Sequence, residues 1–99
     1  MRKKTRKNLR PEFVERKAQA FLDRKFPAWK GNLFAENAVG KFRRGAPGVT
    51  WHVDIRSVSV DRIVGEMGLH PDGKVFYCTK KESLFYSISE AFHIEQGVK

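Results

Sequence analysis

The chain has 99 residues, of which 40% are hydrophobic and 31% are charged, and its formal net charge at pH 7 is +9. This length allows one domain with one compact core. Cys78 is the only cysteine, so the chain can form neither an intramolecular disulfide nor a thiolate metal cluster. No uninterrupted apolar run exceeds four residues, which excludes a membrane-spanning helix and leads us to expect a soluble, cytoplasmic protein without a membrane partner.

The positive charge is concentrated at one end of the chain. Six cations precede the first acidic residue, Glu12, and these are Arg2, Lys3, Lys4, Arg6, Lys7 and Arg10. Residues 11–99 hold 14 Lys and Arg against 11 Asp and Glu. Because residues 1–9 have almost no apolar surface to bury, we expect them to form a disordered basic arm in front of a single domain at residues 10–97.

The first predicted helix begins at Pro11, which suits a first helical turn because no N–H is needed there. Its apolar residues recur at helical spacing, and they are Phe13, Val14, Ala18, Phe21 and Leu22. Pro27 disfavours helical geometry in the residue before it, so the helix is expected to end near Phe26.

Residues 27–48 contain four of the eight glycines and two of the four prolines. This composition predicts a loop-rich region, with either a short strand or a helical turn around residues 33–39. The sequence GKFRRGAPG, residues 40–48, is interpreted as an exposed basic loop with one aromatic residue.

Three strands are predicted after this region. Residues 49–55 alternate strictly between apolar and polar, which is typical of a half-buried strand. The apolar phase then shifts by one residue, so a bulge or a turn is expected within residues 56–62. Residues 62–79 are predicted to form a hairpin, because Pro71 followed by Asp-Gly favours a turn between two alternating segments.

The last predicted helix lies in TKKESLFYSISEAF, residues 79–92. Thr79 and Glu82 have the spacing of a capping box, and Gly97 is a suitable stop. The apolar stripe of this helix consists of Leu84, Phe85, Ile88, Ala91 and Phe92. The predicted fold class is therefore α+β, with an N-terminal helix, a small antiparallel meander sheet of three to four strands, and a C-terminal helix packed on one face.

Most of the aromatic residues are assigned to the hydrophobic core. These are Phe13, Phe21, Trp29, Trp51, Phe76, Phe85 and Phe92. We expect Phe34 and Phe42 to be the aromatic residues most available to a ligand.

Three basic groups are candidates for binding a polyanion. In the arm, Arg2, Lys3, Lys4, Arg6 and Lys7 can displace counterions from a nucleic acid without sequence specificity. In the second group, Phe42 can stack on a base while Lys41, Arg43 and Arg44 contact phosphates. The third group is Lys80 and Lys81, at a helix start that a bound phosphate would favour. Each group can also be solvated surface charge, and the arm can be a solubilising tail.

The segment TKKESLFYSISEAF and the order of helix, strands and helix are loosely similar to the double-stranded RNA-binding domain. That family has a helix, three strands and a helix, with lysines at the start of the last helix. Lys80 and Lys81 match these lysines, whereas Leu84 stands where the family has a third lysine, and Tyr86 and Ile88 stand where it has alanines. The resemblance implies that such a scaffold can present basic residues on one surface.

A metal-dependent nuclease is a further interpretation. Asp54 followed by Asp72-Gly73-Lys74 is similar to a pattern in which two carboxylates hold Mg²⁺ and a lysine assists the attacking water. The Asp-Gly pair also suits a turn, which would keep Asp72 away from Asp54 in the middle of a strand. His52 and Asp54 share a strand face and can be half of a metal site or a cross-strand polar pair.

The sequence favours a small non-enzymatic binding module without cofactor or metal. The leading hypothesis is binding of nucleic acid, DNA or RNA, through its phosphates. The alternative is a protein–protein interaction module, an inhibitor or adaptor of an acidic partner, and a homodimer through a sheet face or edge also stays open. We expect Cys78 to be a small packed residue rather than a nucleophile.

Overall fold

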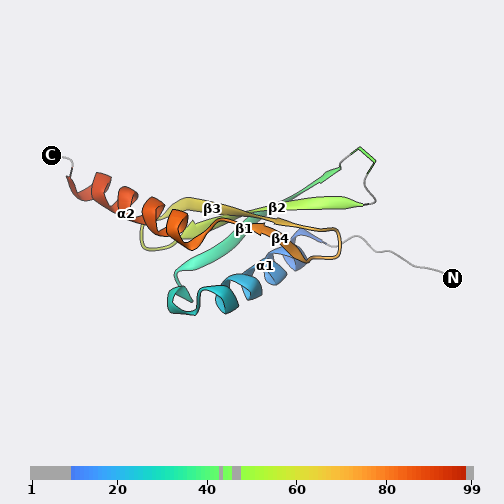
Figure 1. The fold of residues 1–99 in the computed structure, drawn as a ribbon, viewed down its shortest axis with the longest axis horizontal. Coiled ribbons are helices and arrows are strands. Elements are labelled where there is room, and N and C mark those ends of the chain that lie inside the picture. Colours follow the sequence, from blue (N-terminus) through green and yellow to red (C-terminus); the bar gives the residue numbers. More distant parts are fainter. Residues whose placement is uncertain (1–9, 43, 46–47, 98–99) are drawn as a thin grey trace.

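The computed structural model describes residues 10–42, 44–45 and 48–97, with side chains described up to Phe92. Its elements in chain order are α1 (Pro11–Lys25), the 3-10 helix η1 (Pro27–Trp29), β1 (Leu33–Phe42), β2 (Val49–Ser57), β3 (Arg62–Leu69), β4 (Val75–Cys78) and α2 (Lys81–Gly97). The strands form one antiparallel sheet in the order β1-β2-β3-β4, so each strand pairs with its neighbours in the chain (Figure 1). The predicted α+β meander is confirmed, with four strands. The predicted arm, residues 1–9, lies outside the described residues.

α1 buries one face against the sheet. Val14, Ala18 and Leu22, which are spaced four residues apart, are all buried. The N–H of Phe26 donates to the carbonyl of Leu22 and closes the last turn. The helix therefore ends where the following proline predicts.

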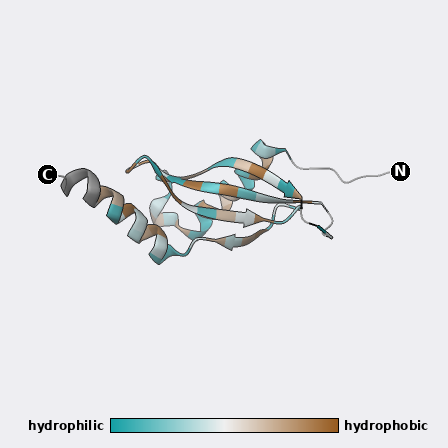
Figure 2. Cartoon of the chain, turned by 90° about the horizontal axis from the view of Figure 1, so that it is seen from above, coloured by the Kyte–Doolittle hydropathy of each residue, from teal (hydrophilic) through white to brown (hydrophobic). Residues whose placement is uncertain are grey.

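The sheet has a covered face and an open face. On β2, Trp51, Val53 and Ile55 are buried on the covered face, whereas His52 and Asp54 between them are partly exposed on the open face. Figure 2 shows the alternation of hydrophobic and hydrophilic residues along the strands. The buried residues of α1 and α2 belong to the same core cluster as the covered face, so both helices pack on this side.

β1 extends over residues 33–42, so the choice between a strand and a helical turn is resolved in favour of a strand. A bulge interrupts its pairing with β2 between Glu36 and Val39. At the bulge, Asn37 has a φ of 59°, in the left-handed region that asparagine adopts more readily than most residues.

Part of the predicted basic loop is β-strand. Lys41 and Phe42 pair with Thr50 and Val49 at the end of β1. The interpretation of residues 40–48 as a loop is therefore wrong at its start. The bulge shifts the register, and the backbone groups of both strands then continue to pair despite the local glycine content.

The outer edge of β1 is bonded to α1. The N–H of Ala35 donates to Gln19 Oε1 at 2.9 Å, and Gln19 Nε2 donates to the carbonyl of Leu33 at 3.0 Å. At the bulge, the N–H of Ala38 donates to Glu15 Oε2 at 3.1 Å. These bonds satisfy backbone groups of an edge strand within the chain, so a second strand could pair there only by displacing α1.

The turn that follows β2 absorbs the phase shift predicted within residues 56–62, because β2 keeps its alternation as far as the buried Ser57. The register between β2 and β3 shifts once, and the N–H of Asp61 donates to the carbonyl of Val58 at 3.2 Å. Asp61 has a φ of 54° in this turn. Asn32 holds the turn from outside, because its Oδ1 accepts the N–H of Ser59 at 2.8 Å.

The predicted hairpin at residues 62–79 is confirmed by β3, β4 and the turn between them. Gly73 has a φ of 93°, and its N–H donates to the carbonyl of His70 at 2.8 Å. Asp72 Oδ1 accepts the N–H of Lys74 at 2.9 Å. Asp72 is therefore a structural part of this turn.

α2 is attached to the sheet through its first turns. Leu84 is fully buried and reaches Gly65 of β3, where an added Cβ would lie 2.7 Å from the leucine side chain. The capping box predicted at Thr79 is not formed by its hydroxyl, which instead bonds the backbone N–H and carbonyl of Glu66 on β3. Figure 1 shows α2 running from the sheet to a point beyond its end. In the described part of the chain, no helix combines the length and the apolar character needed to cross a membrane.

Several aromatic residues that the sequence assigns to the core are exposed. Trp51 is buried and Phe21 and Trp29 are half-buried, but the assignment is wrong for four phenylalanines that are about half exposed, namely Phe13, Phe76, Phe85 and Phe92. The apolar stripes of the helices are wider than the surface that meets the sheet, so Phe13, Phe85 and Phe92 at their margins stay outside. Phe76 lies on β4, where its ring packs over Gly68 of β3. Phe42 is 85% exposed, in agreement with the prediction, whereas Phe34 is only 38% exposed, less than any of those four phenylalanines.

Replacing Gln19 tests the bond between α1 and the edge of β1. We expect Gln19→Ala to lower the free energy of unfolding by about 1–3 kcal/mol, because the carbonyl of Leu33 and the N–H of Ala35 lose their partner. The matched control is Asp23→Ala, which removes only the pair between Asp23 and Gln19 within α1 and should cost about 0.2–0.5 kcal/mol. Equal losses in urea denaturation of the two variants would contradict this role of Gln19.

Candidate nucleic-acid interface

The predicted site residues lie in separate places. Lys41 and Phe42 end β1, where Phe42 is 85% exposed, and Arg44 is exposed in the connection to β2. Lys80 and Lys81 are exposed at the start of α2, which follows β4 at the opposite edge of the sheet. The structure does not bring these two groups together. Arg43 and the arm residues Arg2, Lys3, Lys4, Arg6 and Lys7 lie outside the described residues.

A basic surface that differs from the predicted groups lies between α1 and the turn that joins β3 to β4. This basic cleft has a volume of about 390 Å³. It is lined by Lys17, Ala20, Phe21 and Arg24 of α1 and by Gly73, Lys74 and Val75 across from them. Three of these residues are cations and none is acidic, so the cleft attracts anions.

A row of cations follows the side of α1 that lines this cleft. Lys17 and Arg24 are spaced by seven residues, which is about two helical turns, so they lie close to one line along α1, and Arg10 stands seven residues before Lys17, just ahead of the helix. Glu15 projects from another side of α1 and bonds to β1. The row is therefore kept apart from the acidic residue that anchors the helix.

Phe21 forms an aromatic wall of the cleft. Its ring packs against the core, while the guanidinium carbon of Arg24 and Lys25 Nζ lie 5.9 Å and 6.0 Å from the ring centroid. Such cation–π contacts contribute about 0.5–1 kcal/mol at exposed sites. They keep both cations close to the ring, so the cleft combines an aromatic surface with positioned positive charge.

The three cations of the cleft differ from Arg56, which has a structural role in the sheet. Arg56 pairs with Glu36 at 3.5 Å and also with Asp61. Within the part of the chain that the structure describes, no ion pair involves the three cleft cations. Their charge is thus not neutralised by an ion pair among the described residues, and an anion in the cleft would not have to displace one.

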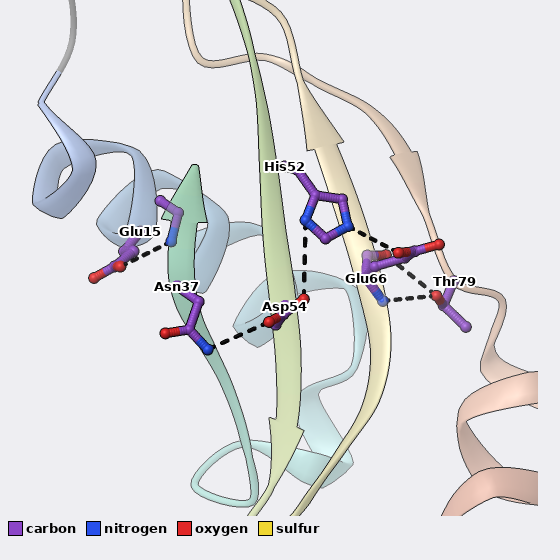
Figure 3. Close-up of polar contacts among 7 residues, drawn as sticks. Glu15, Asn37, His52, Asp54, Glu66 and Thr79 are labelled. Carbon is purple, nitrogen blue, oxygen red and sulfur yellow. Dashed lines mark hydrogen bonds and ion pairs between the residues drawn. The ribbon is translucent and has the colours of Figure 1, made fainter. Parts of the chain in front are cut away.

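A polar cluster lies on the open face of the sheet (Figure 3). His52 Nε2 lies 2.8 Å from Glu66 Oε1, and His52 Nδ1 lies 3.9 Å from Asp54 Oδ1. Asn37 Nδ2 donates to Asp54 Oδ2 at 3.3 Å, and the backbone of Glu66 bonds to the hydroxyl of Thr79. The cluster therefore runs across the sheet from β1 to the residue that follows β4.

The residues of the nuclease pattern occupy different environments. Asp54 lies in the middle of the sheet, where its backbone is opposite that of Glu66 on β3, whereas Asp72 lies in the turn beyond the end of β3. The structure does not bring the two carboxylates together. Among residues 10–42, 44–45 and 48–92, no group of three or more His, Cys, Asp or Glu side chains is arranged to hold a metal ion.

Sequence reasoning alone does not identify the basic cleft. The spacing of Arg10, Lys17 and Arg24 is visible in the sequence and indicates one basic side of a helix. Lys74, however, lies far along the chain and comes opposite Arg24 only because α1 packs beside the β3–β4 turn. The sequence therefore contains no local pattern that places Lys74 in the cleft, because tertiary packing alone brings it there.

Comparison with known proteins identifies no relative of this chain. No family model matches the chain, and no curated protein or solved structure matches it.

Cys78 ends β4 and is half-buried. Its thiol lies 3.5 Å from the carbonyl of Thr79. Burial raises the pKa of the Cys78 thiol above its ordinary value, and the nearby charge of Lys25 offsets only part of this effect. A raised pKa favours the protonated thiol, which is a poor nucleophile near neutral pH.

Alkylation measures the state of this thiol directly. We expect iodoacetamide to modify Cys78 in the folded protein more slowly than in the urea-unfolded chain at neutral pH, because burial limits access and disfavours the thiolate. The rate should rise only at higher pH than in the unfolded chain. A folded-state rate equal to or above the unfolded one would mean that Cys78 is an activated thiolate.

Proposed function

We propose that the protein is a small non-enzymatic module that binds nucleic acid through its phosphates. The observation that carries this proposal is the basic cleft, in which Lys17, Arg24 and Lys74 converge around the ring of Phe21. Phosphate binding by such a surface releases condensed counterions and needs no particular base sequence. The predicted contacts at Lys41, Arg44, Lys80 and Lys81 would extend the same surface chemistry to other parts of the fold.

The basic arm is connected in the sequence to the helix that carries two of the cleft cations. Arg10 directly follows the arm in the sequence and immediately precedes α1. Arm residues that contact neighbouring phosphates would therefore continue the path of a strand bound along α1. Two-thirds of the net charge lies in the first ten residues, so the arm should contribute much of the binding affinity. The cleft should determine where the nucleic acid lies on the folded domain.

The salt dependence of binding tests the cleft. Binding of a labelled mixed-sequence oligonucleotide should weaken log-linearly with salt, and Lys17→Ala/Arg24→Ala should reduce the magnitude of the log–log slope by about 1.5, since two phosphate contacts are lost. The matched control is Arg16→Ala/Lys30→Ala, which removes the same charges from exposed positions that do not line the cleft. The control should leave the slope unchanged.

Equal slope changes in the two double variants would show that only net charge matters and that the cleft is not a contact. Deleting residues 2–7 should flatten the slope further, because the arm contributes separate contacts. Absence of binding to both DNA and RNA at about 50 mM salt, where phosphate contacts are strong, would overturn the proposal. A pull-down with and without nuclease would then reveal whether an acidic protein is the partner.

A further inference from the structure

The open face of the sheet carries a groove that the proposed phosphate contacts do not explain. This open groove has a volume of about 370 Å³, and six of the residues that line it are Lys41, Phe42, His52, Glu66, Phe76 and Tyr77. Most of its surface is apolar, although it lies on the solvent side of the sheet. Ligand sites have this character, with apolar walls and a few polar groups, and their volumes start at about 300 Å³.

Phe76 is held across the floor of the groove by its neighbours. An added Cβ at Gly68 would lie 2.7 Å from the Phe76 ring, so the ring can occupy this place only because β3 has a glycine there. The ring of His70 packs beside it, with 4.7 Å between the centroids. Phe76 is nevertheless 48% exposed. The sheet therefore presents a positioned aromatic ring to solvent.

The other walls provide further stacking and polar groups. Phe42 is 85% exposed and Tyr77 is 49% exposed. Glu66 lies in the groove with one carboxylate oxygen 2.8 Å from His52 Nε2, which leaves its second oxygen able to accept a hydrogen bond. Lys41 adds a cation without an ion pair among the described residues.

This combination matches the chemistry of an unpaired nucleobase. A base offers a flat π surface to the rings of Phe76 and Tyr77 and exocyclic amino groups to the carboxylate of Glu66, while its phosphate can reach Lys41. A base inside a duplex is stacked on both sides and cannot enter such a groove. The volume of the groove suits one base with its sugar better than a larger ligand.

We propose that the open groove binds an unpaired base, so that the nucleic acid recognised is single-stranded. This inference rests on the proposed function and narrows its ligand to single-stranded RNA or DNA. The phosphate contacts of the basic cleft are indifferent to strandedness, whereas base stacking in the groove is not.

The test compares a fluorescently labelled single-stranded oligonucleotide with the duplex of the same sequence, using fluorescence anisotropy and the full chain. Wild-type protein should bind the single strand more tightly. Phe76→Ala should weaken single-strand binding by about five- to a hundred-fold, the range for loss of one stacking residue, and should leave duplex binding unchanged. Phe76→Tyr keeps the ring and should retain the affinity.

Two further variants keep the test decisive. Phe76→Leu preserves apolar packing if Phe76→Ala fails to fold, and it should show the same selective loss. Phe13→Ala removes a phenylalanine of the same 48% exposure from α1, outside both the groove and the cleft, and should change neither affinity.

The outcomes separate this inference from the proposed function. Equal wild-type affinity for single strand and duplex, with no effect of Phe76→Ala or Phe76→Leu, would overturn the open groove as a base site while leaving the phosphate-binding module intact. Absence of binding to either ligand would overturn both.

Discussion

The side-chain amide of Gln19 fixes the relation between the helix and the sheet. It bonds to Leu33 and Ala35 on the free edge of β1, and Glu15 bonds to the same edge four residues earlier on α1. With this side of α1 committed to β1, the helix cannot rotate without breaking bonds to the backbone of an edge strand. Lys17 and Arg24 are therefore directed away from β1, toward the β3–β4 turn. The basic cleft depends on an interaction that involves none of its own cations.

Short-range periodicity in the sequence predicts the two helices, β2, and the β3–β4 hairpin with its Asp-Gly turn. It does not predict the full length of β1, because the bulge at Asn37 interrupts the alternation of apolar and polar residues along the strand. It also misplaces Phe76, whose exposed position depends on the absence of a side chain at Gly68 on another strand. Of the candidate site, the cation row on α1 can be predicted, whereas Lys74 cannot, because long-range packing alone brings it to the cleft.

β4 connects the two candidate binding surfaces. Val75 lines the basic cleft on one side of the strand, and Phe76, the next residue, lines the open groove on the other. Successive residues of a strand point to opposite faces, so a short edge strand can serve both sites. A nucleic-acid strand that runs along the edge of β4 could place phosphates in the cleft and a base in the groove. The charged surface of the basic cleft and the stacking surface of the open groove thus lie on opposite sides of β4.

The attachment of α2 has a consequence for how the protein opens. α2 is held through Leu84 against Gly65, through Ile88 and Ala91 at the core, and through the bonds between Thr79 and Glu66, and its far end extends beyond the sheet. The sheet and α1 supply most of the core cluster and also share the bonds of Gln19. Detachment of α2 should therefore be a sub-global event with a lower free energy than complete unfolding. In native-state hydrogen exchange, the amides of α2 should form a separate, faster-exchanging unit from those of β2 and β3.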